Sequence, residues 1–223
     1  MSAPRSGLIA VVGLLTMTAC AADQVPAPGP TVTSTTLETS TSTSTPCEVD
    51  DGTANALEPL LTDNLPPGYE RAPDAAEDTG PTDLTLAAFF VGGPDERAVL
   101  SSHGYRRGYQ RLWYPPDGGG NDLIVHLYEF CGADGAAAYL RHTRERLLSP
   151  LWDSVEVDTD LPEDVVTLFQ EGDLGGESFV AVLRVDGRFY VEIGAYGGPP
   201  REALDTLVAR AGGLSTAQVD KLP

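Results

Sequence analysis

The alternation of hydrophobic and polar side chains predicts strands over much of the second half of the chain. Apolar residues recur at every second position in several segments, which is the period of a half-buried strand. Asp186-Gly187 lies between two of these segments and is a strong signal for a tight hairpin turn. The predicted strands span residues 105–114, 121–130, 165–169, 178–185 and 188–196.

Helical periodicity predicts a helix after each long strand pair. The first spans residues 133–148, where the apolar stripe is Ala136, Leu140, Thr143 and Leu147.

A last helix is predicted after Pro199-Pro200, and Gly212-Gly213 is expected to end it. Two shorter apolar helices are predicted after Thr82 and from Pro94, because proline is well tolerated at the first position of a helix.

This order of elements predicts an α+β fold, with an antiparallel sheet of about five strands and helices mainly on one face. A strand pair followed by a helix occurs twice, at residues 105–148 and 178–211, so the fold can contain two ββα halves. Hydrophobic residues make up 41% of the chain, which is enough for one domain with its own core.

The N-terminal segment has the layout of a bacterial secretion signal. A short start with Arg5 precedes an apolar stretch from Gly7 to Leu15, which is too short to cross about 30 Å of hydrocarbon. The following Met17-Thr18-Ala19-Cys20 resembles a lipobox, the site where signal peptidase II cleaves before an acylated cysteine. This resemblance implies that residues 1–19 are removed and that Cys20 carries a diacylglycerol. The alternative is ordinary secretion with Cys20 unmodified.

A low-complexity segment follows Cys20. Residues 20–46 are rich in serine, threonine and proline, and the run from Thr31 to Thr45 is almost free of apolar side chains, so burial cannot offset the entropy of ordering this segment. The sequence therefore predicts a lipid-attached disordered tether at 20–46 and a single folded domain at 47–223.

The remaining cysteines support export from the cytoplasm. If Cys20 is acylated, Cys47 and Cys131 are left as one pair, and paired cysteines form disulfides in an oxidising compartment. We therefore predict a Cys47–Cys131 disulfide, with two free thiols as the alternative.

The charge limits the partners of the protein. The chain has 33 acidic and 14 basic residues and a formal net charge of −19. Such a surface repels the phosphates of nucleic acids, so no nucleic-acid partner is expected. An acidic segment around Asp158 and Asp160 lacks the glycine and distal glutamate of an EF-hand loop, which favours a solvated loop over a calcium site. No metal or other cofactor is predicted.

Catalytic signatures are scarce. The chain has no Gly-x-Ser-x-Gly elbow, and Lys221 is its only lysine. The best candidate for a ligand site is the aromatic and arginine-bearing strand at 105–114, whose alternation places Tyr105, Tyr109 and Trp113 on one side. The alternative, which the pattern favours, is that the aromatic residues belong to the core and the arginines pair with nearby acidic residues. His126, in the next predicted strand, is either a hydrogen-bonded sheet histidine or a ligand-contacting group. The candidate ligand-binding residues are Tyr105, Arg107, Tyr109, Arg111, Trp113 and His126.

The lipobox, the tether and the segment Gly104-Tyr105…Tyr109-x-Arg111-x-Trp113 together resemble uncharacterised actinobacterial surface lipoproteins. The resemblance implies attachment to the cell membrane through Cys20, on the extracytoplasmic side, and implies no particular activity. We expect a non-enzymatic domain that binds a small ligand or an envelope protein. One alternative is an envelope hydrolase that uses His126 with Glu129 or Glu192. Another is a structural or sensory part of a cell-wall assembly.

Overall fold

The computed structural model of the protein describes residues 47, 56–73, 79–92, 94–115, 122–171, 177–197 and 204–223. All of these lie in one compact unit, Ser44–Pro223. The predicted signal segment, Cys20 and the predicted tether lie outside the described residues. No helix in the described ranges combines the length and the apolar character needed to cross a bilayer.

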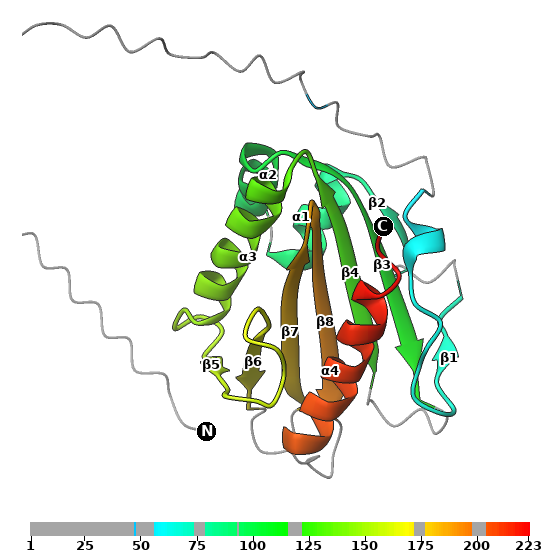
Figure 1. Ribbon diagram of the computed structural model, residues 1–223. Helices are drawn as coiled ribbons and strands as arrows, with labels where there is room; N and C mark the ends of the chain where they lie inside the picture. The colour runs from blue at the N-terminus through cyan, green and yellow to red at the C-terminus, as the bar shows by residue number, and fades with distance from the viewer. Residues whose placement is uncertain are drawn as a thin grey trace, which may run out of the picture. The chain divides into compact units, whose positions relative to one another are not determined.

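An antiparallel sheet of eight strands forms the centre of the unit (Figure 1). The strand order is β1-β3-β4-β8-β7-β6-β5, and β2 also pairs with β3. The α+β prediction is confirmed, but the strand count was too low, because three edge strands of two or three residues are too short to show alternation. The strands are β1 (Glu70–Arg71), β2 (Gly80–Thr82), β3 (Tyr105–Tyr114), β4 (Leu123–Phe130), β5 (Val155–Glu156), β6 (Val166–Gln170), β7 (Ser178–Asp186) and β8 (Phe189–Gly197).

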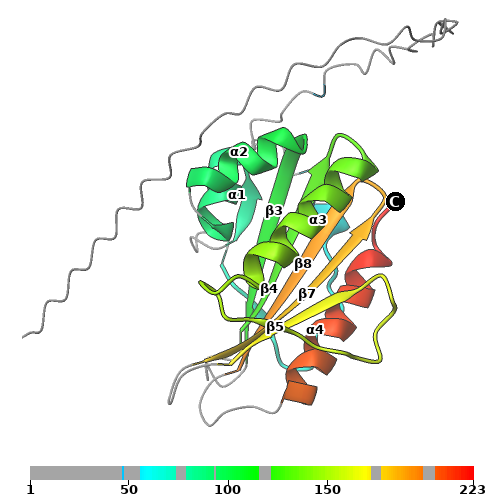
Figure 2. The same ribbon diagram turned by 90° about the vertical axis from the view of Figure 1, so that its left-hand side faces the viewer.

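Helices cover both faces of the sheet. Buried residues of α1, α2 and α3 pack with one face, here called the α3 face, and buried residues of α4 pack with the other, here called the α4 face. Figure 2 shows α1, α2 and α3 in front of the sheet. The helical elements are a 3-10 turn at Glu58–Leu60 and the helices α1 (Leu84–Val91), α2 (Pro94–Ser102), α3 (Ala133–Leu147) and α4 (Leu204–Val219).

The alternation of side chains along the strands explains why each face of the sheet has its own hydrophobic core. In β4, Val125 and Leu127 are buried on the α4 face, whereas Tyr128 and Phe130 are buried on the α3 face. The sheet is therefore apolar on both sides in its centre, as the sequence of this strand indicated.

Two details correct the expectations from the sequence. The pairing of β3 with β4 contains an irregularity between Tyr105 and Arg107, which turns Tyr105 to the α3 face while Tyr109 and Trp113 lie on the α4 face. The prediction that Gly212-Gly213 ends the last helix was wrong, because α4 continues to Val219 and buries Leu214.

The two ββα units are present, but they differ in handedness of packing. Helix α3 follows β3 and β4 and covers one face, whereas α4 follows β7 and β8 and covers the other. Because β4 pairs antiparallel with β8, a two-fold rotation that exchanged the hairpins would place both helices on the same face. The two halves are therefore not related by such a rotation.

The predicted disulfide is confirmed. Cys47 is bonded to Cys131, and their Cα atoms lie 5.6 Å apart. The bond fixes the start of the domain beside the end of β4, next to Gly104, whose φ of +76° suits glycine.

Candidate functional site

The predicted ligand-binding residues lie on both faces of the sheet. Tyr109 and Trp113 are each only 2% exposed and belong to the core of the α4 face. Tyr105 is fully buried on the α3 face, where its hydroxyl donates to the carbonyl oxygen of Thr82 at 2.7 Å. His126 is also on the α3 face. The aromatic residues of β3 are therefore core residues, and they do not form one site with His126.

The two predicted arginines of β3 are engaged in ion pairs. Arg107 Nε donates to a carboxylate oxygen of Glu129, and Arg111 Nη2 donates to Glu58 Oε1 at 2.8 Å. Burial acts to raise the pKa of Glu58, but the hydrogen bonds from Arg111 and Arg71 and the positive charges of both arginines together outweigh burial and lower the pKa. Both arginines have a structural partner on the α4 side of the sheet.

His126 lines a cleft on the α3 face, between α1 and α3. Two adjoining cavities, of about 140 and 310 Å³, share part of their walls. The second is at the lower end of the range for small-molecule sites. The shared residues are Phe90 of α1, Ile124 and His126 of β4, and Tyr196 of β8.

The deeper part of the cleft is mainly aromatic, with one arginine and one glutamate. The smaller cavity is also lined by Arg146 of α3, Trp152, Gln170 of β6, Phe179 of β7 and Glu192 of β8. The Arg146 guanidinium lies over the Trp152 ring, 5.2 Å from its centroid. Gly194 of β8 lies next to two wall residues, since a Cβ atom there would lie 2.5 Å from Ile124 Cγ2 and 2.8 Å from Phe179 Cε2, so any other residue would displace them.

Arg146 has unused hydrogen-bonding capacity. Its Nε and Nη1 atoms are buried and have no hydrogen-bond partner among the described residues. Buried polar atoms in folded proteins nearly always have a partner, which can be water or a ligand. The positive charge of Arg146 and these two donors favour an acceptor such as a carboxylate in the deep part of the cleft.

A network of hydrogen bonds fixes the polar side chains on the sheet floor. Tyr190 Oη donates to Glu192 Oε2 at 2.7 Å, and His126 Nδ1 lies 3.2 Å from Tyr128 Oη. His126 and Glu192 are direct register partners on adjacent strands. Burial raises the pKa values of Tyr128 and Tyr190 well above the usual range, so both phenols keep their protons.

The outer part of the cleft is acidic. The larger cavity adds Gln110, Asp122 and Glu177 to the wall. Burial, and then the negative charge of Glu177, raises the pKa of Asp122. Gln110 Oε1 is buried without a hydrogen-bond partner in the part of the chain that the structure describes. This end of the cleft therefore offers acceptors, whereas the deep end offers donors.

Sequence reasoning found His126 but missed most of this cleft. Arg146 gives no distinct sequence signal of a site, because a base near the C-terminal end of a helix is explained by the helix dipole. Phe90 and Gln170 come from distant segments whose proximity depends on the strand order. The one sequence signal that could have placed Arg146 in the cleft was its spacing in α3. Tyr139, Thr143 and Arg146 are spaced so that they lie on one side of the helix, toward the sheet.

Two further cavities, of about 460 and 480 Å³, flank the acidic segment around Asp158 and Asp160. Across the described ranges, no group of three or more histidine, cysteine, aspartate or glutamate side chains is arranged to hold a metal ion.

Comparison with known proteins gives little further information. No model of a protein family matches the chain, and no curated protein matches it. Among solved structures, the extracellular domain of PknH from Mycobacterium tuberculosis matches with a TM-score of 0.42 and 17% sequence identity, over 72% of this chain and 79% of that chain. A similarity of this degree does not assign a function.

Proposed function

We propose that the protein is a lipid-anchored cell-envelope protein whose folded domain binds a small ligand in the cleft between α1 and α3. The observation that carries the ligand-binding part is that Arg146 lines the smaller cavity while its buried Nε and Nη1 atoms have no hydrogen-bond partner among the described residues. The lipobox-like segment that ends at Cys20 supports the anchor. The Cys47–Cys131 bond supports an extracytoplasmic location, because disulfides persist in oxidising compartments.

The cleft favours a ligand with two unlike ends. A carboxylate or similar acceptor would pair with Arg146, and an apolar or ring-bearing part would pack against Phe90, Phe179 and Trp152. A donor group at the other end would suit Asp122 and Gln110.

Phenylacetate is a suitable probe for the deep part of the cleft because it joins a ring to a carboxylate. We expect amide chemical shifts around Arg146, Gln170 and Glu192 to move when phenylacetate is titrated into isotopically labelled protein. Phenylacetamide, which lacks the charge, should cause smaller shifts. Arg146→Met should abolish the response.

Arg144→Met is a matched control for this experiment. Arg144 lies two residues away on the same helix, but it is half-exposed and pairs with Glu156. The variant should respond to phenylacetate like the wild type. Shifts that persist in Arg146→Met, or no shifts in the wild type at millimolar probe, would reject the cleft as the site.

The anchor is tested separately. Protein recovered from bacterial membranes should show an intact mass that fits a diacylglycerol on a chain beginning at Cys20, and Cys20→Ala should release the protein from the membrane fraction. An unmodified chain in the culture fluid would contradict the anchor without bearing on the cleft.

A hydrolase is the second candidate function, and one observation favours it. His126 and Glu192 line the same cavity and are neighbours across the β4–β8 pair, so a histidine base and a carboxylate are available to a bound substrate. Hydrolysis of activated esters that both His126→Gln and Glu192→Gln abolish would support this function. Equal rates in the wild type and both variants would reject it.

A further inference from the structure

Two carboxylates lie together at the outer end of the cleft. Asp122, directly before β4, and Glu177, directly before β7, both line the larger cavity of about 310 Å³. They are close enough that the charge of Glu177 contributes to the raised pKa of Asp122. Neither carboxylate forms an ion pair or a hydrogen bond with another side chain of the described residues. Both therefore keep their acceptor oxygens for a ligand.

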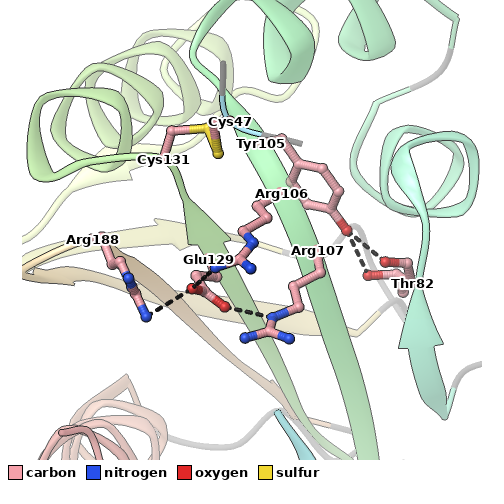
Figure 3. A network of polar contacts seen from close by, with 8 residues as sticks. All are labelled: Cys47, Thr82, Tyr105, Arg106, Arg107, Glu129, Cys131 and Arg188. Atoms are coloured by element: carbon pink, nitrogen blue, oxygen red, sulfur yellow. Dashed lines mark hydrogen bonds and ion pairs between the residues drawn. A yellow bond between two sulfur atoms is a disulfide. The ribbon is translucent and has the colours of Figure 1, made fainter. Parts of the chain in front are cut away.

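Other carboxylates near the sheet are neutralised by the protein itself. Glu129 lies among three arginines, as Figure 3 shows, and Glu58 accepts hydrogen bonds from two more. In contrast, the described walls of the larger cavity contain no arginine or lysine. The repulsion between Asp122 and Glu177 is therefore not compensated by a neighbouring base, and a bound cation would relieve it.

Gln110 gives an independent indication that a donor belongs in this cavity. Its side chain lines the larger cavity from β3, where its register partner on β4 is His126. Gln110 is only 1% exposed, and its Oε1 atom is buried without a hydrogen-bond partner among the described residues. A buried amide oxygen nearly always accepts a hydrogen bond in a folded protein. The cavity thus combines an uncharged acceptor with two carboxylates, and all three favour a ligand group with N–H donors.

An organic ammonium group fits these acceptors better than a metal ion. Calcium takes about six to eight oxygen ligands, and the described residues contain no group of three or more histidine, cysteine, aspartate or glutamate side chains that could hold a metal. A primary ammonium group has three N–H donors. These donors match the carboxylates of Asp122 and Glu177 and the Oε1 atom of Gln110.

The outer acceptors and Arg146 lie at different ends of the cleft. Ile124 and His126 of β4 line both cavities, whereas Arg146 lines the smaller one and Asp122 the larger one. Asp122 precedes His126 by four residues, which corresponds to about 13 Å along a strand. A single α-amino acid is too short for both ends, because one carbon atom joins its ammonium and carboxylate groups. An extended peptide advances about 3.3–3.6 Å per residue, so a chain of about three residues has a suitable length.

We propose that the cleft binds a short peptide with a free N-terminus, whose ammonium group lies between Asp122 and Glu177 and whose C-terminal carboxylate pairs with Arg146. This inference rests on the proposed ligand-binding function and names the class of ligand. Gln110 Oε1 accepts the third N–H of the ammonium group. An aromatic residue at the C-terminus of the peptide places its ring against the aromatic wall of the smaller cavity.

Calorimetric titration with the peptide Gly-Gly-Phe tests the proposal. N-acetyl-Gly-Gly-Phe is the matched probe, because acetylation removes the N-terminal charge and leaves the ring and the carboxylate. We expect saturable binding of both peptides to the wild type, with the free peptide bound about three- to tenfold more tightly, as two partly exposed ion pairs would give. The variant Asp122→Asn/Glu177→Gln should bind both peptides with equal affinity. Neither side chain has a structural partner among the described residues, so the variant should fold.

The variant Asp158→Asn/Glu163→Gln is the matched control. It removes the same two negative charges from exposed positions that line a different cavity, in a chain with a formal charge of −19. This variant should keep the full preference for the free peptide. An equal loss of preference in the control would show that the whole acidic surface attracts the ammonium group, and it would overturn the proposal. An unchanged preference in Asp122→Asn/Glu177→Gln would overturn it as well.

Arg146→Met and phenylacetate separate this inference from the proposed function. Arg146→Met should weaken the free and the acetylated peptide by the same factor, because both carry the carboxylate. Equal binding of the two peptides to the wild type would overturn the ammonium site and leave the carboxylate site intact. Binding of phenylacetate without binding of either peptide would reject the peptide as the ligand class but not the cleft as the site. If neither phenylacetate nor the peptides bind, the proposed function and this inference are both rejected.

Discussion

At the scale of single residues, the contact between Arg111 and Glu58 shows how a charged side chain is tolerated in the core of the α4 face. Arg111 is only 4% exposed and donates to Glu58 Oε1 at 2.8 Å, and Arg71 donates to the same oxygen at 2.9 Å. A buried charge without a partner is costly, so Glu58 compensates Arg111 and fixes the Glu58–Leu60 turn against β3.

Glu58→Gln should lower the free energy of unfolding by about 1–2 kcal/mol at pH 7, because Arg111 loses a charged acceptor. The pKa of Glu58 is lowered in the folded state, so its stabilising effect is complete above the usual value of 4.5 and disappears as the pH falls through the lower folded value. Urea unfolding at pH 7 and at pH 3 measures the difference. Glu70→Gln, at an exposed position of β1, serves as control, and an equal loss at both pH values would contradict the role of charge.

Gly108 lies at a position that requires glycine. A Cβ atom there would lie 2.3 Å from Thr82 Oγ1 and 2.6 Å from Tyr128 Cδ1. Gly108→Ala should therefore destabilise the protein by about 1–3 kcal/mol, since β2 and the Tyr128 ring would have to move. Gly132→Ala is the control, because nothing lies within 4 Å of the equivalent Cβ atom. Thermal unfolding of both variants measures this difference, and equal midpoint temperatures would show that β2 moves without loss of stability.

At the scale of elements, helix α4 contains two adjacent glycines with opposite surroundings. A Cβ atom on Gly212 would lie 2.7 Å from Leu161 Cδ2, whereas nothing lies within 4 Å of one on Gly213. Gly212 thus lets the segment before β6 approach the helix closely, although glycine weakens a helix.

Gly213→Ala should stabilise the protein by about 0.5–1 kcal/mol, because alanine favours the helix and meets no neighbour. Gly212→Ala should destabilise it by about 1–3 kcal/mol through the contact with Leu161. Chemical denaturation of the two variants gives an internally controlled comparison. If both variants were stabilised, Leu161 would not be packed as described.

These elements also show what the sequence could predict. The alternation in β3 and β4 and the stripe of α3 located those elements within two residues, because each buries a continuous apolar face. The end of α4 was misplaced because tertiary contacts of Leu214 and Gln218 outweigh the local preference of Gly212-Gly213. The side of Tyr105 was misplaced because an irregularity in strand pairing has no distinct sequence signal.

The candidate site was less predictable than the fold. The cleft combines His126 and Glu192 from paired strands with Phe90 of α1 and Arg146 of α3. Their proximity follows from the placement of β8 beside β4, which makes the fourth and eighth strands of the chain neighbours. Local periodicity contains no information about that order, so only His126, with Glu192 as one of two candidate partners, could be suggested in advance.

At the scale of the whole molecule, the disulfide joins the beginning of the domain to the middle of its sequence. Cys47 and Cys131 are 84 residues apart, and the bond closes a loop that includes α1, α2, β3 and β4. The chain-entropy model assigns such a loop about 4 kcal/mol of stabilisation, through the restricted unfolded state.

We therefore expect reduction with a phosphine to lower the free energy of unfolding by about 2–4 kcal/mol. The Cys47→Ser/Cys131→Ser variant should have the stability of the reduced wild type and should not respond to the reductant, which separates loss of the bond from other effects of the reagent. Urea unfolding with and without reductant measures both quantities. Because the strands β1 to β4 and the helices α1 and α2 within the loop keep their own hydrogen bonds, the reduced protein should keep its secondary structure at low urea, and circular dichroism checks this. Alkylation of Cys47 and Cys131 in the untreated protein would contradict the bond itself, and with it the support for an oxidising compartment.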